Sequence, residues 1–155
     1  MIFVDTNIFY NIFFETELSL PAKELIETPS NLVTSFTVLN ELIFISVRKL
    51  AEKRYGIKNY FEFRRFIAEN GYEPFKVDID LVFGLINERD ILVVTDHQSV
   101  DDWREIMVNY RLLTNDALIA TTCKYHDIKR IATFDGDFDR VDFLEVVKLD
   151  NASSY

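Results

Sequence analysis

Two short apolar segments of this chain each end in acidic residues, and this pattern constrains the fold more than any other feature. Near the N-terminus, the run Ile2–Val4 is followed directly by Asp5. Near the C-terminus, Arg130–Phe134 is predicted to be a buried strand, and the acid-rich stretch Asp135–Asp139 follows it. Apolar strands that end in clustered acids are typical of the carboxyl edge of a parallel sheet, where α/β proteins keep their sites. We therefore expect both strands to contribute acids to one shared metal site.

The rest of the chain alternates short apolar runs with amphipathic segments of helical period. Strands are predicted over 1–5, 32–34, 91–94, 129–134 and 145–149. Helices are predicted over about 8–14, 18–27, 36–54, 57–70, 78–88, 99–111 and 114–126. The expected N-caps include Ser35 for the helix over 36–54, and Thr114 or Asn115 for the last helix. Strands alternating with helices predict an α/β fold with a parallel sheet covered on both faces.

Length and composition place limits on the class of protein. The 155 residues predict one domain over 1–150, followed by a short polar tail over 151–155. No apolar run approaches the roughly 20 residues that span a membrane, and no secretory signal is evident. The single cysteine, Cys123, lies among apolar helical neighbours and is expected to be a core thiol. These features together favour a cytoplasmic protein without an internal disulfide.

The charge is distributed unevenly along the chain. The net charge is −9, yet the segment Arg48–Arg65 holds seven basic residues against two acids, which leaves −14 on the remainder. Such a basic segment is suited to phosphates or an acidic partner peptide, although a solvated helix face is the alternative interpretation. The candidate RNA- or partner-binding residues are Arg48, Lys49, Lys53 and Arg54.

Four acids stand at the places where a parallel α/β sheet gathers its functional groups. They are Asp5, Glu41, Asp116 and Asp135, which we call the acidic quartet. Each has a structural alternative, such as a turn, a helix start or the edge of an apolar stripe. Two unit charges 4 Å apart repel by about 4 kcal/mol at an effective dielectric near 20, so a cluster requires protonation or a hard cation. Ligands with oxygen donors alone suit Mg²⁺ or Mn²⁺, which can activate water toward a phosphodiester.

With these motifs in order, the chain resembles a PIN domain, the fold of many metal-dependent ribonucleases. The matching segments are Asp5-Thr6-Asn7, Val38–Leu42 around Glu41, Thr114–Ala120 around Asp116, and Thr133–Phe138. The resemblance covers almost the whole chain and implies a three-layer α/β/α domain with a mainly parallel central sheet. It also implies Mg²⁺- or Mn²⁺-dependent endoribonuclease activity, with the acidic quartet both catalytic and metal-binding.

The resemblance further implies partners and supporting residues. Small single-domain members are commonly VapC-type toxins of toxin–antitoxin pairs and often dimerise, so RNA, an antitoxin and a second copy of the chain are the expected partners. Asp137 is the implied supporting metal ligand. Thr6, Asn7 and Thr133 would orient the carboxylates or water by hydrogen bonds. One departure from the family pattern is the long segment between Glu88 and Asn115, which carries an extra acidic cluster of Asp96, Asp101, Asp102 and Glu105.

Three other classes compete with this interpretation. The spacing of acids from Asp135 matches the start of an EF-hand loop, but Arg140 and Val146 occupy the positions that need Gly and Glu. An aspartyl phosphatase would require an acid at position 7, where the chain has Asn7. A catalytically inactive PIN-like scaffold that binds RNA or protein is the main alternative, and the intact acidic quartet argues against it.

Overall fold

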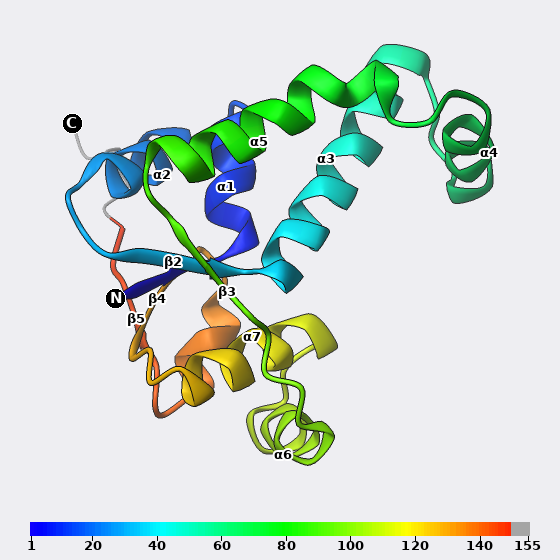
Figure 1. The fold of residues 1–155 in the computed structure, drawn as a ribbon. Coiled ribbons are helices and arrows are strands. Elements are labelled where there is room, and N and C mark those ends of the chain that lie inside the picture. The colour runs from blue at the N-terminus through cyan, green and yellow to red at the C-terminus, as the bar shows by residue number, and fades with distance from the viewer. Residues whose placement is uncertain (150–155) are drawn as a thin grey trace.

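A five-stranded, all-parallel sheet forms the centre of the molecule (Figure 1). The computed structural model describes residues 1–149, so the predicted tail over 151–155 lies outside the described residues. The strands are β1 (Ile2–Val4), β2 (Leu32–Ser35), β3 (Leu92–Val94), β4 (Arg130–Ala132) and β5 (Glu145–Val146). Their order in the sheet is β3-β2-β1-β4-β5. The chain therefore adds β2 and β3 on one side of β1, and then adds β4 and β5 on the other side.

Helices cover both faces of this sheet, which confirms the three-layer α/β/α prediction (Figure 1). On one face lie α1 (Thr6–Phe13), α2 (Ser19–Glu27), α3 (Phe36–Tyr55) and α5 (Lys76–Glu88). On the other face lie α6 (Val100–Tyr110) and α7 (Thr114–Tyr125). The remaining elements are α4 (Tyr60–Asn70) and two short 3₁₀ helices, η1 (Glu73–Phe75) and η2 (Gly136–Arg140). None of the helices among residues 1–149 has both the length and the apolar character needed to cross a bilayer.

The hydrophobic core has two parts. The main cluster packs the helices onto strands whose central side chains, such as Phe3 and Ile131, are fully buried. The twenty residues of α3 span about 30 Å, so its C-terminal half extends beyond the sheet (Figure 1). There Val47 and Leu50 of α3 pack with Phe63 of α4 and Phe75 of η1 in a separate cluster. This second cluster fixes the position of α4 relative to the rest of the molecule.

The structure differs from the sequence prediction mainly at the ends of elements. Helix α4 begins at Tyr60 rather than 57, because Gly56 ends α3 in a left-handed conformation (φ 67°) and Asn59 caps α4 by accepting from the Glu62 amide at 2.8 Å. The last strand ends at Val146 instead of 149. Thr114 is the first residue of α7 rather than its cap, and the N-cap residue Leu113 makes no side-chain bond.

Candidate active site

The carboxyl ends of β1 and β4 meet at the point where the direction of sheet building reverses. The connection from β1 crosses one face of the sheet toward β2, whereas the connection into β4 crosses the other face. A crevice is therefore expected outside the carboxyl ends of these two strands. Asp5 directly follows β1, and its amide donates to the Ala132 carbonyl at 3.1 Å. Asp135 lies three residues beyond Ala132, so both acids stand at this crevice.

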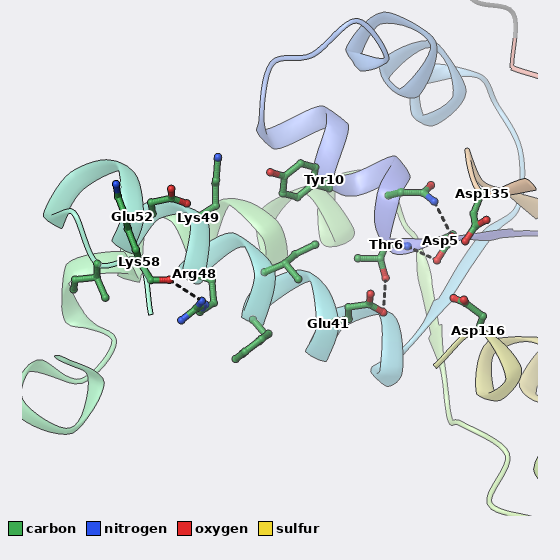
Figure 2. Close-up of a pocket in the computed structure, with 14 residues that line it drawn as sticks. Asp5, Thr6, Tyr10, Glu41, Arg48, Lys49, Glu52, Lys58, Asp116 and Asp135 are labelled. Atoms are coloured by element: carbon green, nitrogen blue, oxygen red, sulfur yellow. Dashed lines mark hydrogen bonds between the residues drawn. The ribbon is translucent and has the colours of Figure 1, made fainter. Parts of the chain in front are cut away.

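All four members of the acidic quartet line one cavity of about 530 Å³ (Figure 2). Asp5 and Asp135 come from the strand ends, Asp116 from the first turn of α7, and Glu41 from the second turn of α3. Figure 2 shows the four side chains gathered at one end of the cavity, which we call the acidic end. The structure thus brings together the four acids that the sequence separates by up to 130 residues.

The tightest group of acids consists of Asp116, Asp135 and Asp137, whose ligand oxygens lie within 4.8 Å of one another. Three carboxylate oxygens at such spacing fit a hard divalent cation, since no softer donor is part of the group. Asp137 contributes from η2 and also accepts from Arg140 at 2.6 Å. Because Arg140 donates further to the carbonyls of Tyr110 and Arg111, it anchors this turn to the end of α6.

Asp5 is the most deeply buried acid of the site, with 4% of its surface exposed. Its Oδ1 accepts from the Thr6 amide at 2.7 Å, and its Oδ2 accepts from the Thr133 hydroxyl at 2.7 Å and the Asn7 amide group at 3.1 Å. Burial raises the pKa of Asp5 to about 7, although the bonds from Thr133 and Thr6 oppose the shift. The charges of Asp116 and Glu41 add to the rise of this pKa.

Asn7 and Thr133 join the ends of the two strands. The Asn7 side chain donates to the Thr133 hydroxyl at 3.0 Å and accepts from the Phe134 amide at 3.0 Å. The Thr133 hydroxyl in turn accepts from the Asp135 amide at 3.0 Å. Each of these residues thus holds a backbone or carboxylate group in place.

The other two acids are more exposed to solvent than Asp5. Asp116 is half-buried, and burial together with the charges of Asp135, Glu41 and Asp137 raises its pKa to about 6. The Glu41 carboxylate accepts from the Thr6 hydroxyl and the Asn115 side chain, each at 3.4 Å. Asn115 was not predicted to contribute to the site, although its position immediately before Asp116 is a signal that sequence analysis could have used.

The four basic candidates do not share one location. Arg48 and Lys49 line the cavity, together with Lys58, which the sequence analysis did not single out. Lys53 and Arg54 lie on the same helix but do not line it. Arg54 instead forms two hydrogen bonds of 2.7 Å with Asp78 of α5. The long helix therefore places its basic residues on different faces.

The N-terminus of α3, which carries Glu41, is capped from another strand. Ser35 occupies the predicted N-cap position, but its hydroxyl is buried and has no hydrogen-bond partner among residues 1–149. The Asp96 carboxylate instead accepts from the Thr37 amide at 3.1 Å. Parallel pairing explains this contact, because Ser35 aligns with Val94 in the sheet and Asp96 follows two residues later. One acid of the extra cluster therefore supports the helix that positions Glu41.

Replacing Asp96 tests this capping contact. Asp96→Ala should lower the free energy of unfolding by about 1 kcal/mol, because the first turn of α3 loses its acceptor. Asp96→Asn should stay close to wild type, since Asn caps helices about as well as Asp. Urea unfolding followed by circular dichroism measures both variants. Equal losses in the two would mean that the charge of Asp96, and not its capping bond, matters.

The fold and the acids together define a class of protein. It is an α/β/α domain with a parallel sheet, and its clustered carboxylates, of a kind suited to a divalent metal ion, lie where the direction of sheet building reverses. The family model of the PIN domain matches residues 2–144, and the chain belongs to this family. Two curated relatives from Methanocaldococcus jannaschii support the assignment. Ribonuclease VapC2 is 38% identical over 154 residues, covering 96% of this chain and 93% of the relative. Ribonuclease VapC6 is 31% identical over 150 residues, covering 95% and 96%.

A solved structure extends the likeness at the level of the fold. A chain of a toxin–antitoxin complex from Klebsiella pneumoniae superposes with a TM-score of 0.56 at 17% identity. The match covers 97% of this chain and 98% of that one. At this identity the comparison bears on the fold alone, and it agrees with the three layers described above.

Proposed function

We propose that this protein is a metal-dependent endoribonuclease that hydrolyses RNA phosphodiesters with an activated water. The observation that carries the proposal is the gathering of the acidic quartet in one cavity, with Asp116, Asp135 and Asp137 within 4.8 Å of one another. The names of the curated relatives, Ribonuclease VapC2 and VapC6, agree with it. A calcium-binding loop would not require acids from four separate elements.

In this proposal the tight acidic group would hold Mg²⁺ or Mn²⁺, with Asp5 and Glu41 completing the site. A divalent ion there would lower the pKa of a water molecule and offset the charge that develops on the phosphate. Asp5 is held in a fixed orientation by Thr6, Asn7 and Thr133, so its carboxylate position is set before substrate arrives. Because burial raises the pKa of Asp5 from its ordinary value to about 7, its carboxyl keeps a proton to a higher pH than an exposed aspartate does. Its proton must leave when a cation binds.

Chelation and one matched pair of variants test the proposal. RNA cleavage by the purified protein should stop in EDTA and return when Mg²⁺ or Mn²⁺ is added in excess. Asp135→Asn should remove the activity, because it deletes a ligand charge. Asp139→Asn is the control, since this exposed acid lies in the same turn outside the tight group. Cleavage that persists in EDTA by protein verified to be metal-free would defeat the mechanism.

We further propose that the protein is the toxin of a toxin–antitoxin pair acting in the cytoplasm. A chain of the Klebsiella pneumoniae toxin–antitoxin complex shares this fold, which is consistent with an antitoxin partner. A homodimer, implied by the family resemblance, is part of the same proposal. Growth arrest on expression, relieved by Asp5→Asn, would support the toxin, and sedimentation velocity would report the oligomeric state. Unimpaired growth with active protein present would instead favour a housekeeping nuclease.

A further inference from the structure

The cavity that holds the acidic quartet has a second, basic end. Arg48, Lys49 and Lys58 line it there with a single acid, Glu52 (Figure 2). Helix α3 connects the two ends, because Glu41 and Arg48 lie seven residues apart and therefore about 10 Å along the helix axis. The chain has a net charge of −9, so three basic side chains close to a cluster of carboxylates are unexpected. This placement suggests that they bind an anionic ligand.

Arg48 is held in place without a carboxylate partner. Its guanidinium carbon lies 5.1 Å from the ring centroid of Phe63, and its Nη2 donates to the Lys58 carbonyl at a long 3.4 Å. Its Nη1 is buried and has no acceptor within residues 1–149. Since Nη1 is shielded from solvent, an oxyanion in the cavity can supply its missing bond only if the guanidinium turns toward the cavity that it lines.

Arg54, two turns further along α3, shows how the chain treats an arginine that is not reserved for a ligand. Both of its terminal nitrogens bond to the Asp78 carboxylate, so its charge is already matched within the protein. No carboxylate of the described residues forms such a pair with Arg48. Arg54 thus joins α3 to α5, whereas Arg48 lines the cavity.

We propose that Arg48, with Lys49 and Lys58, binds a backbone phosphate of a single-stranded RNA segment next to the phosphate that is cleaved. The inference rests on the proposed function and assigns the basic end of the same cavity. Phosphate oxygens accept two parallel bonds from a guanidinium, which fixes position as well as adding affinity. The strand would thus lie along α3, with the scissile phosphate at the acidic end.

The wall between the two ends favours an unpaired strand. Tyr10 and Phe44 line the cavity there, and Figure 2 shows Tyr10 between the acidic and basic groups. Aromatic faces in such a place can stack on a base only when that base is not paired with another strand. Ile45 of α3 adds apolar surface to the same wall. The cavity therefore offers a single RNA strand groups for its phosphates at both ends and aromatic faces for its bases between them.

Binding of a fluorescein-labelled, mixed-sequence single-stranded RNA, followed by anisotropy in EDTA over a salt series, tests the proposal. Arg48→Gln should weaken binding about 10- to 100-fold, because a charge-assisted pair is lost. The slope of log affinity against log salt should fall by about one unit. Lys23→Gln is the control, because Lys23 is an exposed lysine of α2 that does not line the cavity, and it should change affinity by less than about twofold. Arg48→Lys should lie between Arg48→Gln and wild type, because a lysine keeps the charge without the fork.

A second variant guards against a folding defect in Arg48→Gln, whose side chain packs on Phe63. Lys58→Gln alters an exposed residue outside the regular elements and should also weaken RNA binding and lower the salt slope. Wild-type affinity in both variants would overturn the proposal. So would an equal loss in Lys23→Gln, which would indicate general charge attraction only. Unchanged RNA binding combined with lost binding of a poly-glutamate peptide would assign the basic end to a protein partner instead.

Cleavage assays with Mg²⁺ separate this inference from the proposed function. Arg48→Gln should raise KM by the same factor with kcat close to wild type, since Arg48 lies away from the reacting phosphate. If the wild type binds RNA through Arg48 but never cleaves it, the phosphate site stands and the nuclease proposal fails. If the wild type cleaves RNA and Arg48→Gln has an unchanged KM, the nuclease proposal stands and the phosphate site fails.

Discussion

Replacing Asp116 by Asn should abolish metal-dependent RNA cleavage while leaving the metal-free protein as stable as wild type or more stable. The two results belong together because both follow from the same negative charge. Cleavage should fall at least about 100-fold, because a charge that helps to hold the cation is gone. Stability in EDTA should not fall, because the variant removes a carboxylate that its neighbours repel.

The sign of this effect can be worked out from the shifted pKa values. The carboxyls of Asp116 and Asp5 have an ordinary pKa of 3.8, and the fold raises these values to about 6 and about 7. At pH values between the ordinary pKa and the raised pKa, the two carboxyls hold protons in the folded protein that they have released in the unfolded chain. The free energy of unfolding of the metal-free protein should therefore fall as pH rises from about 4 to about 7. Asp116→Asn should weaken this pH dependence, so its advantage over wild type should grow toward pH 8.

Thermal melts in EDTA and in Mg²⁺ measure both parts of the prediction. At an ion concentration 100 times its dissociation constant, wild type should gain about 2.7 kcal/mol, or roughly 5–10 °C in Tm. Asp116→Asn should gain much less. Asp101→Asn is the control, because Asp101 also stands in the first turn of a helix but lies outside the cavity. If Asp116→Asn melts well below wild type in EDTA and responds equally to Mg²⁺, Asp116 is a structural helix-start residue.

Replacing Thr133 by Val should destabilise the protein by about 1–3 kcal/mol, although the two side chains are nearly equal in shape. Thr133 is 5% exposed, and its hydroxyl donates to Asp5 and accepts from Asn7 and from the Asp135 amide. Removing the hydroxyl leaves Oδ2 of Asp5 with one donor fewer. It also leaves the side-chain amide of Asn7 and the backbone amide of Asp135 with one acceptor fewer each. Such groups have little access to water in this site, so the loss is not repaired by solvent.

The loss in Thr133→Val should also depend on pH. The bond from Thr133 lowers the pKa of Asp5, so its removal should raise that pKa above about 7. A carboxyl with a more strongly raised pKa loses more stability as pH rises, so the deficit should be larger at pH 8 than at pH 5. Urea unfolding of the metal-free protein at these two pH values measures it. Thr121→Val is the control, because this buried hydroxyl bonds only to the Ala117 carbonyl within α7 and should give a constant difference. An equal deficit at both pH values in Thr133→Val would show that the hydroxyl does not act on Asp5.

Asp116 is a member of the acidic quartet, and Thr133 bonds to another member, Asp5. The four acids of this quartet can be grouped from the sequence alone, before the fold is known. Asp5 and Asp135 follow apolar runs, and any parallel sheet places such residues on one edge. Glu41 and Asp116 lie near the starts of helices, which reach the same edge because each helix follows a strand or its connecting loop. Local order along the chain was sufficient here, since strand direction and helix polarity alone determine which end of each element faces the site.

Side-chain direction and boundaries depended on contacts between distant segments. The basic residues of α3 formed one group in the sequence, but the tertiary structure gave Arg48 to the cavity and paired Arg54 with Asp78. Asp137, expected to be a supporting ligand, lies within 4.8 Å of Asp116 and Asp135 by its ligand oxygen.

What the sequence by itself determined was the alternation of strands and helices and the acids at their ends, because hydrophobic period and chain order are local properties. What only the tertiary structure decided was which neighbour each polar group meets. The cap of α3 shows the difference: Ser35 stands at the predicted position, but burial in β2 leaves its hydroxyl without a role there. Asp96, 59 residues from Thr37 along the chain, makes the bond because β3 pairs beside β2. A pairing between strands has no local signature, so only the folded sheet could supply that partner.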